Sequence, residues 1–276
     1  MQEKASLPIG LFDSGMGGLT VFKALASYLP NEHLMYLGDT ARLPYGTKGR
    51  ETIIRYTLLA ARKLIERGVK MLVIACNTAT ANALPTVSKE FAPLPVVGVV
   101  EPGARAAIEV SHTGRILVIA TEATIKSDVY AKAILKLRPD AETSAKACTL
   151  FVPMAEEGLM QGKLVEDLCR YYLDDIFGPK AKKPRPDTMI LGCTHFPLLK
   201  NALERVVGSD VHVVDPAATV AKTVQKELQN KQLFNPFPTK PVYHFMTTDN
   251  CERFARTGTL FLGRSLEPAE IELVDL

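Results

Sequence analysis

The feature that most limits the possible folds is a series of short, continuous apolar runs bounded by turn residues. The runs occupy residues 8–12, 33–38, 70–76, 94–100, 115–121, 187–193 and 210–215. Because their apolar residues are consecutive rather than alternating, the runs are typical of strands covered on both faces, as in parallel sheets. Helix-like segments lie between them, and the sequence therefore predicts an α/β fold with mainly parallel sheets.

The segment 51–68 shows how the helices are expected to pack on these strands. Its apolar residues recur at helical spacing, and Gly68 is a suitable residue to end the helix. The spacing predicts a buried face made of Ile54, Leu58, Ala61 and Ile65.

A faint internal repeat indicates two similar lobes. The stretches "IGLFDSG" and "ILVIATEAT" each open a strand–helix series, and each series leads on to a strand that ends in cysteine. Between the two series, Glu101-Pro102-Gly103 is typical of a loop and is predicted to cross from one lobe to the other.

We therefore expect a first lobe formed by residues 1–98 and 215–276, and a second formed by residues 99–214. In open α/β sheets, ligands bind beyond the carboxyl ends of the strands. Cys76 and Cys193 lie at such ends. The sequence therefore predicts an active site in the cleft between the lobes.

Composition excludes several classes of function. Hydrophobic residues make up 47% of the chain, charged residues 23%, and the formal net charge is only +3, which gives no reason to expect nucleic acid or a membrane as partner. The basic run at 180–186 contains prolines and no aromatic residue, and is expected to be a solvated loop. With five cysteines, no C-x-x-C pair and no signal-like apolar segment, we expect a cytoplasmic protein with reduced thiols and no metal site.

The two cysteines at strand ends are the strongest candidates for chemistry. A cysteine between a strand and a helix N-terminus feels the partial positive charge of unpaired N–H groups, which makes its thiolate accessible. A single buried cysteine could equally be inert packing. Two in matching settings favour function, and each precedes polar residues: Asn77, Thr78, Thr194 and His195.

The glycine-rich turn "DSGMGG" at 13–18 follows a predicted strand, but it lacks both the complete dinucleotide-binding pattern and a Walker lysine. Such a turn can still present backbone N–H groups to a carboxylate. In such a turn Asp13 could bind an ammonium group of the ligand or assist a thiol. The alternative is that its side chain caps the N-terminus of a helix. His195 is close enough in sequence to Cys193 to exchange a proton with it.

Together these stretches resemble the glutamate racemases, within the cofactor-independent aspartate/glutamate racemase family. The resemblance extends from about residue 8 to about residue 216 and is carried by "FDSGMGG", "LGDTARLPYG", "IACNTATA", "VVGVVEPG", "FVPMAEEG" and "LGCTHFPLL".

The resemblance implies an isomerase that interconverts L- and D-glutamate without a cofactor and supplies D-glutamate for peptidoglycan, acting as a cytoplasmic homodimer. It implies Cys76 and Cys193 as the catalytic acid/base pair, with Cys76 acting on the D enantiomer and Cys193 on the L enantiomer. Asp13, His195 and Glu156 would tune the thiols. The implied substrate contacts are Asp13, Ser14, Pro44, Tyr45, Gly46, Asn77, Thr78, Thr121, Thr124, Thr194 and His195.

The implied chemistry agrees with the residues themselves. Inverting a Cα–H centre requires a proton to leave one face and another to arrive on the opposite face, so two matched groups are needed. A cysteine hydrolase with Cys193 as nucleophile and His195 as base remains open, but it leaves Cys76 unexplained. A non-catalytic amino-acid-binding protein and a pyridoxal-phosphate racemase are further alternatives, although no convincing lysine and phosphate loop is present for the latter.

Overall fold

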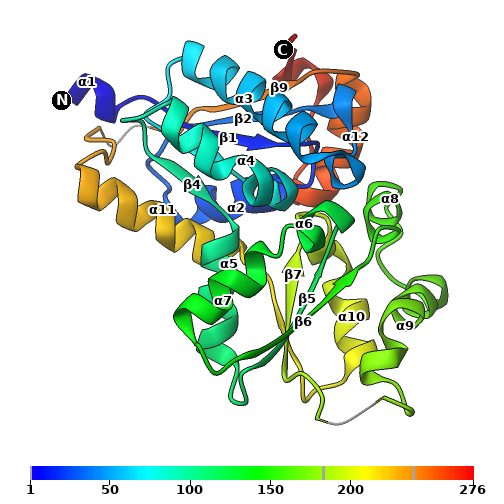
Figure 1. Ribbon diagram of the computed structural model, residues 1–276. Helices are drawn as coiled ribbons and strands as arrows, with labels where there is room; N and C mark the ends of the chain where they lie inside the picture. Colours follow the sequence, from blue (N-terminus) through cyan, green and yellow to red (C-terminus); the bar gives the residue numbers. More distant parts are fainter. Residues whose placement is uncertain (1, 182–183, 238–239) are drawn as a thin grey trace.

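The computed structural model describes residues 2–181, 184–237 and 240–276. They form two sheets of parallel strands, one in each of two lobes that lie one above the other in Figure 1. Two residues of the predicted basic loop, 182 and 183, lie outside the described residues. None of the helices that the structure describes combines the length and apolar character that a membrane crossing needs.

The larger sheet has six strands in the order β10-β9-β2-β1-β3-β4. Its strands are β1 (Ile9–Asp13), β2 (Leu34–Gly38), β3 (Met71–Ile74), β4 (Val96–Gly98), β9 (Tyr243–Thr247) and β10 (Ile271–Leu273). The smaller sheet has four strands in the order β6-β5-β7-β8. They are β5 (Arg115–Ala120), β6 (Glu142–Ala147), β7 (Thr188–Gly192) and β8 (His212–Val214).

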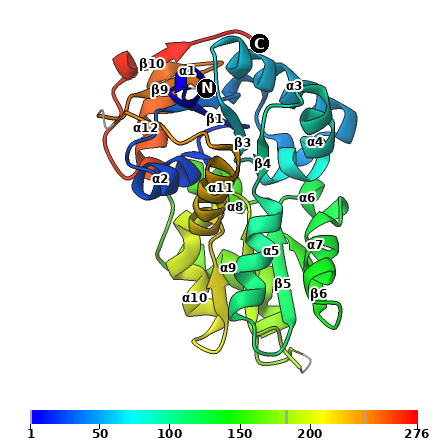
Figure 2. The ribbon, with the colours of Figure 1, turned by 90° about the vertical axis from the view of Figure 1, so that its left-hand side faces the viewer.

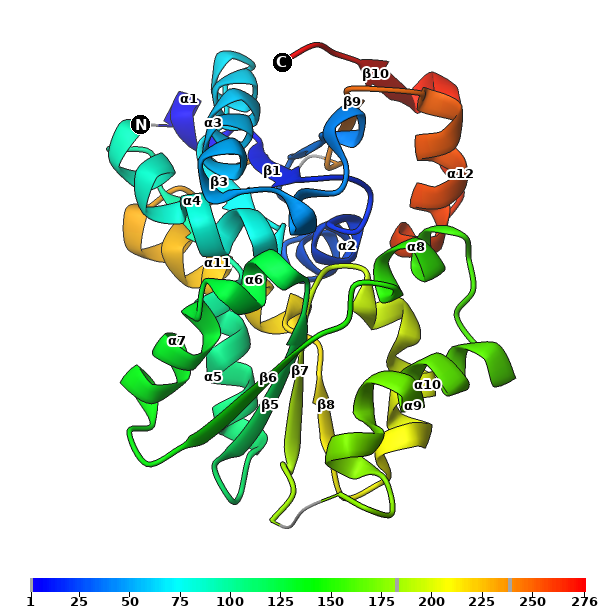
Figure 3. The same cartoon turned by 45° about the vertical axis from the view of Figure 1, so that its right-hand side comes forward.

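Helices cover both faces of each sheet (Figure 3). Around the larger sheet lie α1 (Gln2–Ala5), α2 (Leu19–Tyr28), α3 (Arg50–Glu66), α4 (Asn77–Glu90), α11 (Ala217–Lys231) and α12 (Cys251–Leu262), with the short turns η1 (Thr40–Arg42), η2 (Tyr45–Thr47) and η4 (Pro268–Glu270). Around the smaller sheet lie α5 (Val100–Val110), α6 (Glu122–Lys126), α7 (Val129–Leu137), α8 (Phe151–Glu156), α9 (Lys163–Phe177), α10 (Lys200–Val207) and η3 (Phe196–Leu199).

The two sheets share one arrangement. The order β2-β1-β3-β4 in the larger sheet corresponds to β6-β5-β7-β8 in the smaller one, and every neighbouring pair is parallel. The larger sheet differs by the addition of β9 and β10 beside β2. The predicted α/β fold with two similar lobes is confirmed.

The continuous apolar runs are explained by cores on both faces of each strand. Leu11 and Phe12 are consecutive residues of β1, yet they pack into different hydrophobic clusters on opposite sides of the sheet. In β5, Leu117 and Val118 divide in the same way. Side chains alternate between the two faces of a strand, so every residue is buried when helices cover both faces.

The chain passes between the sheets twice, from β4 into α5 and from β8 into α11. The first passage differs from the prediction, because Glu101-Pro102-Gly103 lies in the first turn of α5 rather than in a loop. Proline, which has no backbone N–H, is tolerated there because the N–H groups of the first turn have no acceptor within the helix. After the second passage, α11 packs beside α2 and α5, where Val220 and Val224 join the core of the larger sheet (Figure 2).

The predicted helix at 51–68 forms as α3, but its buried face is rotated from the one expected. The buried residues are Ile53, Thr57, Ala60, Ala61 and Leu64, while Ile54, Leu58 and Ile65 are only partly buried. The prediction of the face was wrong by about one residue because a wide apolar stripe fits two neighbouring orientations of a helix.

Candidate active site

Cys76 occupies the N-cap of α4, directly after the strand β3 and Ala75. Its sulfur accepts a hydrogen bond from the backbone N–H of Ala79 at 3.4 Å, and its thiol donates to the hydroxyl of Ser14 at 3.4 Å. Burial and the nearby carboxylate of Asp13 raise the pKa of Cys76 to about 12, outweighing these hydrogen bonds. At neutral pH the Cys76 thiol is therefore protonated and able to donate a proton.

Cys193 follows β7, the strand of the smaller sheet that corresponds to β3. Its sulfur lies 3.8 Å from Nδ1 of His195, and Nε2 of the same ring lies 3.1 Å from Oε1 of Glu156. Burial alone would lower the pKa of His195, but its contacts with Cys193 and Glu156 outweigh burial and raise the pKa to about 10. The ring is thus an imidazolium at neutral pH, and a cation beside a sulfur stabilises the thiolate form.

Asp13 ends β1 and lies between the two lobes, with its side chain fully buried. Its carboxylate accepts the backbone N–H of Gly15 at 3.0 Å and the hydroxyl of Thr194 at 3.4 Å. Burial raises the pKa of Asp13, although the charge of His195 opposes this shift. The N-cap alternative is wrong, because Gly18 occupies the N-cap of α2.

The glycine-rich turn after β1 brings the lobes into direct contact. A Cβ atom added at Gly17 would lie 2.6 Å from Nδ1 of His195 and closer still to the hydroxyl of Thr194. Only glycine leaves room for the backbone of one lobe to approach these side chains of the other.

A cluster of three hydroxyls forms a second contact between the lobes. The hydroxyl of Thr78, on α4, lies 2.8 Å from that of Thr121 and 3.2 Å from that of Thr124, on the other lobe. The backbone of Gly46 packs against Thr121, where a Cβ atom would come within 2.7 Å. Each hydroxyl can donate a hydrogen bond, as recognition of a carboxylate requires, because an ionised carboxylate only accepts.

Tyr45 is held beside this cluster by Asp39. Its hydroxyl donates to the buried carboxylate of Asp39 at 2.5 Å, which also accepts from Arg42 at 2.9 Å and from Thr248 at 2.8 Å. Pro44, also predicted to contact substrate, is exposed and forms the N-cap of η2.

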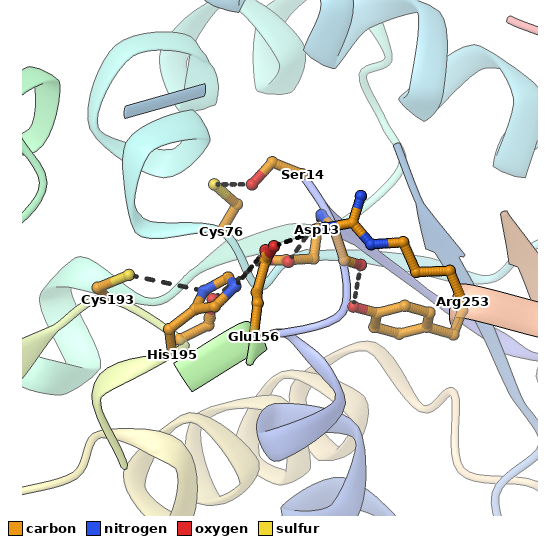
Figure 4. A network of polar contacts seen from close by, with 10 residues as sticks. Asp13, Ser14, Cys76, Glu156, Cys193, His195 and Arg253 are labelled. Carbon is orange, nitrogen blue, oxygen red and sulfur yellow. Dashed lines mark hydrogen bonds and ion pairs between the residues drawn. The ribbon is translucent and has the colours of Figure 1, made fainter. Parts of the chain in front are cut away.

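Figure 4 shows how the two thiols, with Asp13, Ser14, Glu156 and His195, converge on one group of polar side chains. Apart from Pro44 and the partly buried Glu156, all the predicted site residues are buried. Within the described residues, no group of three or more histidine, cysteine or acidic side chains is placed to hold a metal ion.

Comparisons with known proteins identify the family of the chain. The family model for Asp/Glu/Hydantoin racemase matches residues 9–224. A glutamate racemase from Geobacter metallireducens is 45% identical over 258 residues, covering 94% of this chain and 93% of that protein. The chain belongs to the Asp/Glu/Hydantoin racemase family.

Solved structures of racemases extend the similarity to the whole fold. Glutamate racemase from Francisella tularensis, in complex with D-glutamate, has a TM-score of 0.89 and 38% identity, and the match covers 98% of each chain. Isoform RacE1 of glutamate racemase from Bacillus anthracis has a TM-score of 0.91 and 34% identity, again over 98% of each chain. The resemblance carried by the sequence motifs is confirmed.

Two residues at this racemase-like site were missed by sequence reasoning. Tyr130, on α7, donates a hydrogen bond at 2.6 Å to the side-chain oxygen of Asn77 on the other lobe. Arg253, on α12, contacts Oε2 of Glu156 through its guanidinium at 3.2 Å. Neither lies in a motif, and their contacts arise only when the lobes come together.

Proposed function

We propose that the protein interconverts L- and D-glutamate by proton transfer at Cα, with Cys76 and Cys193 as the two acid/base groups. The observation that carries the proposal is that equivalent strands, β3 and β7, are each followed by a buried thiol, and the two thiols enter one polar site from two lobes. Relatives that match more than nine-tenths of the chain are glutamate racemases, and one was solved with D-glutamate.

In the direction from L to D, Cys193 acts first as a thiolate. The Cα–H bond of L-glutamate breaks, its proton forms an S–H bond on Cys193, and the electron pair remains on the substrate as a carbanion. Cys76 then gives its thiol proton to the opposite face of Cα, which leaves Cys76 as the thiolate. The reverse direction uses the same two steps in reverse order, and each needs one protonated and one deprotonated sulfur.

The difference in charge around the sulfurs supports this assignment. Asp13 and burial keep Cys76 protonated, whereas the imidazolium of His195 stabilises negative charge beside Cys193. The resting protein therefore holds a proton donor at Cys76 and, beside Cys193, a cation that favours the thiolate needed to remove the α-proton of L-glutamate.

The remaining groups would bind substrate and stabilise the carbanion. The N-terminus of α4 offers backbone N–H groups and a positive dipole end to an α-carboxylate that gains charge in the transition state. Asp13 offers a negative partner for the ammonium group. The proposed further contacts are Ser14, Pro44, Tyr45, Gly46, Asn77, Thr78, Thr121, Thr124, Thr194 and His195.

The test is circular dichroism of L-glutamate and, separately, D-glutamate, incubated with protein that has been dialysed against chelator and given no cofactor. Both signals should decay to zero at the racemic mixture. A stable signal would contradict the activity, and activity that appears only with pyridoxal phosphate would contradict the cofactor-independent mechanism.

A second experiment tests the number of bases. Starting from L-glutamate in deuterated water and stopped early, the D-glutamate formed should carry deuterium at Cα while the remaining L-glutamate stays mostly protiated. Cys76 delivers a deuteron exchanged from solvent, whereas a single base would label substrate and product at comparable rates. Extensive early labelling of the recovered L-glutamate would contradict two separate bases.

We further propose a first lobe of residues 1–98 with 215–276 and a second of residues 99–214, a homodimeric assembly, and a role in supplying D-glutamate for peptidoglycan in the cytoplasm. Light scattering tests the assembly, and rescue of a bacterial strain that needs external D-glutamate tests the role. A monomeric mass would contradict the homodimer. Failure of a catalytically active protein to rescue the strain would contradict the role in supplying D-glutamate.

A further inference from the structure

Arg253 lies outside every motif that the sequence revealed, yet it contacts the group of residues around Cys193. It stands in the first turn of α12, where its backbone N–H donates to the N-cap side chain of Asn250 at 2.9 Å. This bond fixes the start of the helix. The guanidinium then reaches across to the other lobe, where α8 ends at Glu156 (Figure 4).

Glu156 receives one partner on each carboxylate oxygen. His195 contacts Oε1 at 3.1 Å, and Arg253 contacts Oε2 at 3.2 Å. A carboxylate held at both oxygens has one orientation, and so does the imidazole ring bound to it. Because the other nitrogen of that ring faces the sulfur of Cys193, the position of Glu156 fixes the geometry at the thiol.

A second contact from the same helix supports this arrangement. The ring of Phe261, two turns after Arg253 on α12, packs edge-on against the ring of His195 with centroids 5.1 Å apart. Residues eight apart on a helix are offset by only about 80° around its axis, so both can face the other lobe. Helix α12 thus contacts both the carboxylate and the imidazole.

We propose that Arg253 is a positioning residue of the racemase reaction, which acts through Glu156 and His195 on Cys193. The proposal rests on the proposed racemase function. It assigns to the carboxyl-terminal part of the chain a role in the chemistry as well as in the fold.

The charges around Glu156 predict the direction in which its pKa should move when Arg253 is replaced. The charged groups that face Glu156 are His195, from the loop after β7, and Arg253, from α12; Asp13 faces His195 from β1. Burial raises the pKa of Glu156, but the hydrogen bond to His195 and the charges of His195 and Arg253 outweigh it, so the net shift is downward. Removing Arg253 should therefore raise this pKa and move the acidic limb of kcat/KM to higher pH.

The experiment is a double-mutant cycle with Arg253→Met, which keeps the aliphatic stem, and Glu156→Gln. Arg253→Met should lower kcat/KM about tenfold, whereas in the Glu156→Gln background the same change should alter it less than about twofold. Arg253→Lys should restore part of the activity. Arg256→Met, at an exposed position of the same helix, is the matched control and should behave like the wild type.

Equal losses in the two backgrounds, or an acidic limb that does not move, would overturn the proposal, since they would indicate a role in folding alone. The titration of Glu156, followed by carbon NMR of labelled carboxylates and assigned by comparison with Glu156→Gln, needs no turnover. If the wild type failed to racemise glutamate while Arg253→Met still raised this pKa, the racemase function would fail and the link between Arg253 and Glu156 would stand.

Discussion

The two thiols occupy the same place in two similar lobes but have opposite surroundings. Cys76 follows β3 and has a carboxylate and a hydroxyl as neighbours, while Cys193 follows β7 and has an imidazolium. The residues that come next are also paired across the lobes: Asn77 accepts from Tyr130, and Thr194 donates to Asp13. The shared topology brings two sulfurs to one site, and the differing neighbours keep Cys76 protonated and place a cation beside Cys193.

The largest expected effect follows from removing each sulfur in turn. Cys76→Ala and Cys193→Ala should each lower racemisation by roughly 10³-fold or more, because each removes a proton-transfer group while little packing is lost. Cys251→Ala, on a partly buried thiol that donates to the backbone carbonyl of Ile271 rather than to a site residue, should keep normal activity. The assay is circular dichroism of both enantiomers.

Exchange with deuterated water then separates the two thiols. Cys76→Ala should still exchange the α-proton of L-glutamate, and Cys193→Ala that of D-glutamate. If both variants exchanged the same enantiomer, the two sulfurs would not face opposite sides of the carbon.

A smaller effect is expected in the reactivity of the thiols toward iodoacetamide near neutral pH. The sulfurs are equally hidden, with 5% of Cys76 and 6% of Cys193 exposed, so access does not favour either. With a pKa of about 12, Cys76 is almost entirely protonated, and the imidazolium beside Cys193 should make that residue react about tenfold faster or more. Peptide mass spectrometry measures both rates.

The difference should shrink in His195→Asn, which removes the cation but keeps a polar side chain. Equal rates for the two thiols in the wild-type protein would show that their surroundings do not control their protonation.

A moderate effect is expected on stability across pH. The pKa of His195 is about 10 in the folded protein, against 6.5 for an unperturbed histidine. A raised histidine pKa stabilises the folded state fully below the unfolded pKa, and this contribution is lost as pH rises through the folded pKa. The free energy of unfolding of the wild type should therefore exceed that of His195→Asn by more at about pH 6 than at about pH 10. Urea unfolding measures it, and a constant difference would contradict the imidazolium.

The smallest effect concerns the hydrogen bond between Tyr130 and Asn77. Tyr130→Phe leaves a buried amide oxygen without its donor and should lower the free energy of unfolding by about 1–2 kcal/mol. Tyr28→Phe, on a side chain that is 41% exposed, should change it little. If Tyr130→Phe were as stable as Tyr28→Phe, the hydrogen bond between Tyr130 and Asn77 would make no measurable contribution to stability.

Sequence reasoning identified the elements whose signal is local. Cys76 and Cys193 each follow a fully buried apolar run, so the strand and the position of the cysteine after it can be read directly from the sequence. The edge strand β6 was missed because it is polar and largely exposed, and β9 and β10 were missed because their short runs lie outside the motifs. Cover on both faces is not enough for detection, because Phe245 and Met246 of β9 pack into clusters on opposite sides of the sheet.

The contacts of Arg253, Tyr130 and Phe261 could not be predicted for a different reason. Each residue is ordinary in its own helix, and its role depends on which side chain of the other lobe it meets. Such a contact depends on the docking of two folded lobes, which leaves no periodic or spacing signal in the sequence. Arg253 is also half-exposed, with 52% of its side chain accessible, as an ordinary surface arginine would be.

The insertion of β9 beside β2 has a consequence for biosynthesis. A ribosome makes the chain from its amino terminus, so β1 to β4 and both thiols emerge well before β9 and α12. Until β9 arrives, the edge of β2 remains unpaired and open to association with other chains. The partly made protein thus carries both sulfurs but lacks Arg253 and Phe261, so the contacts of α12 with Glu156 and His195 form only after the carboxyl-terminal part has been made.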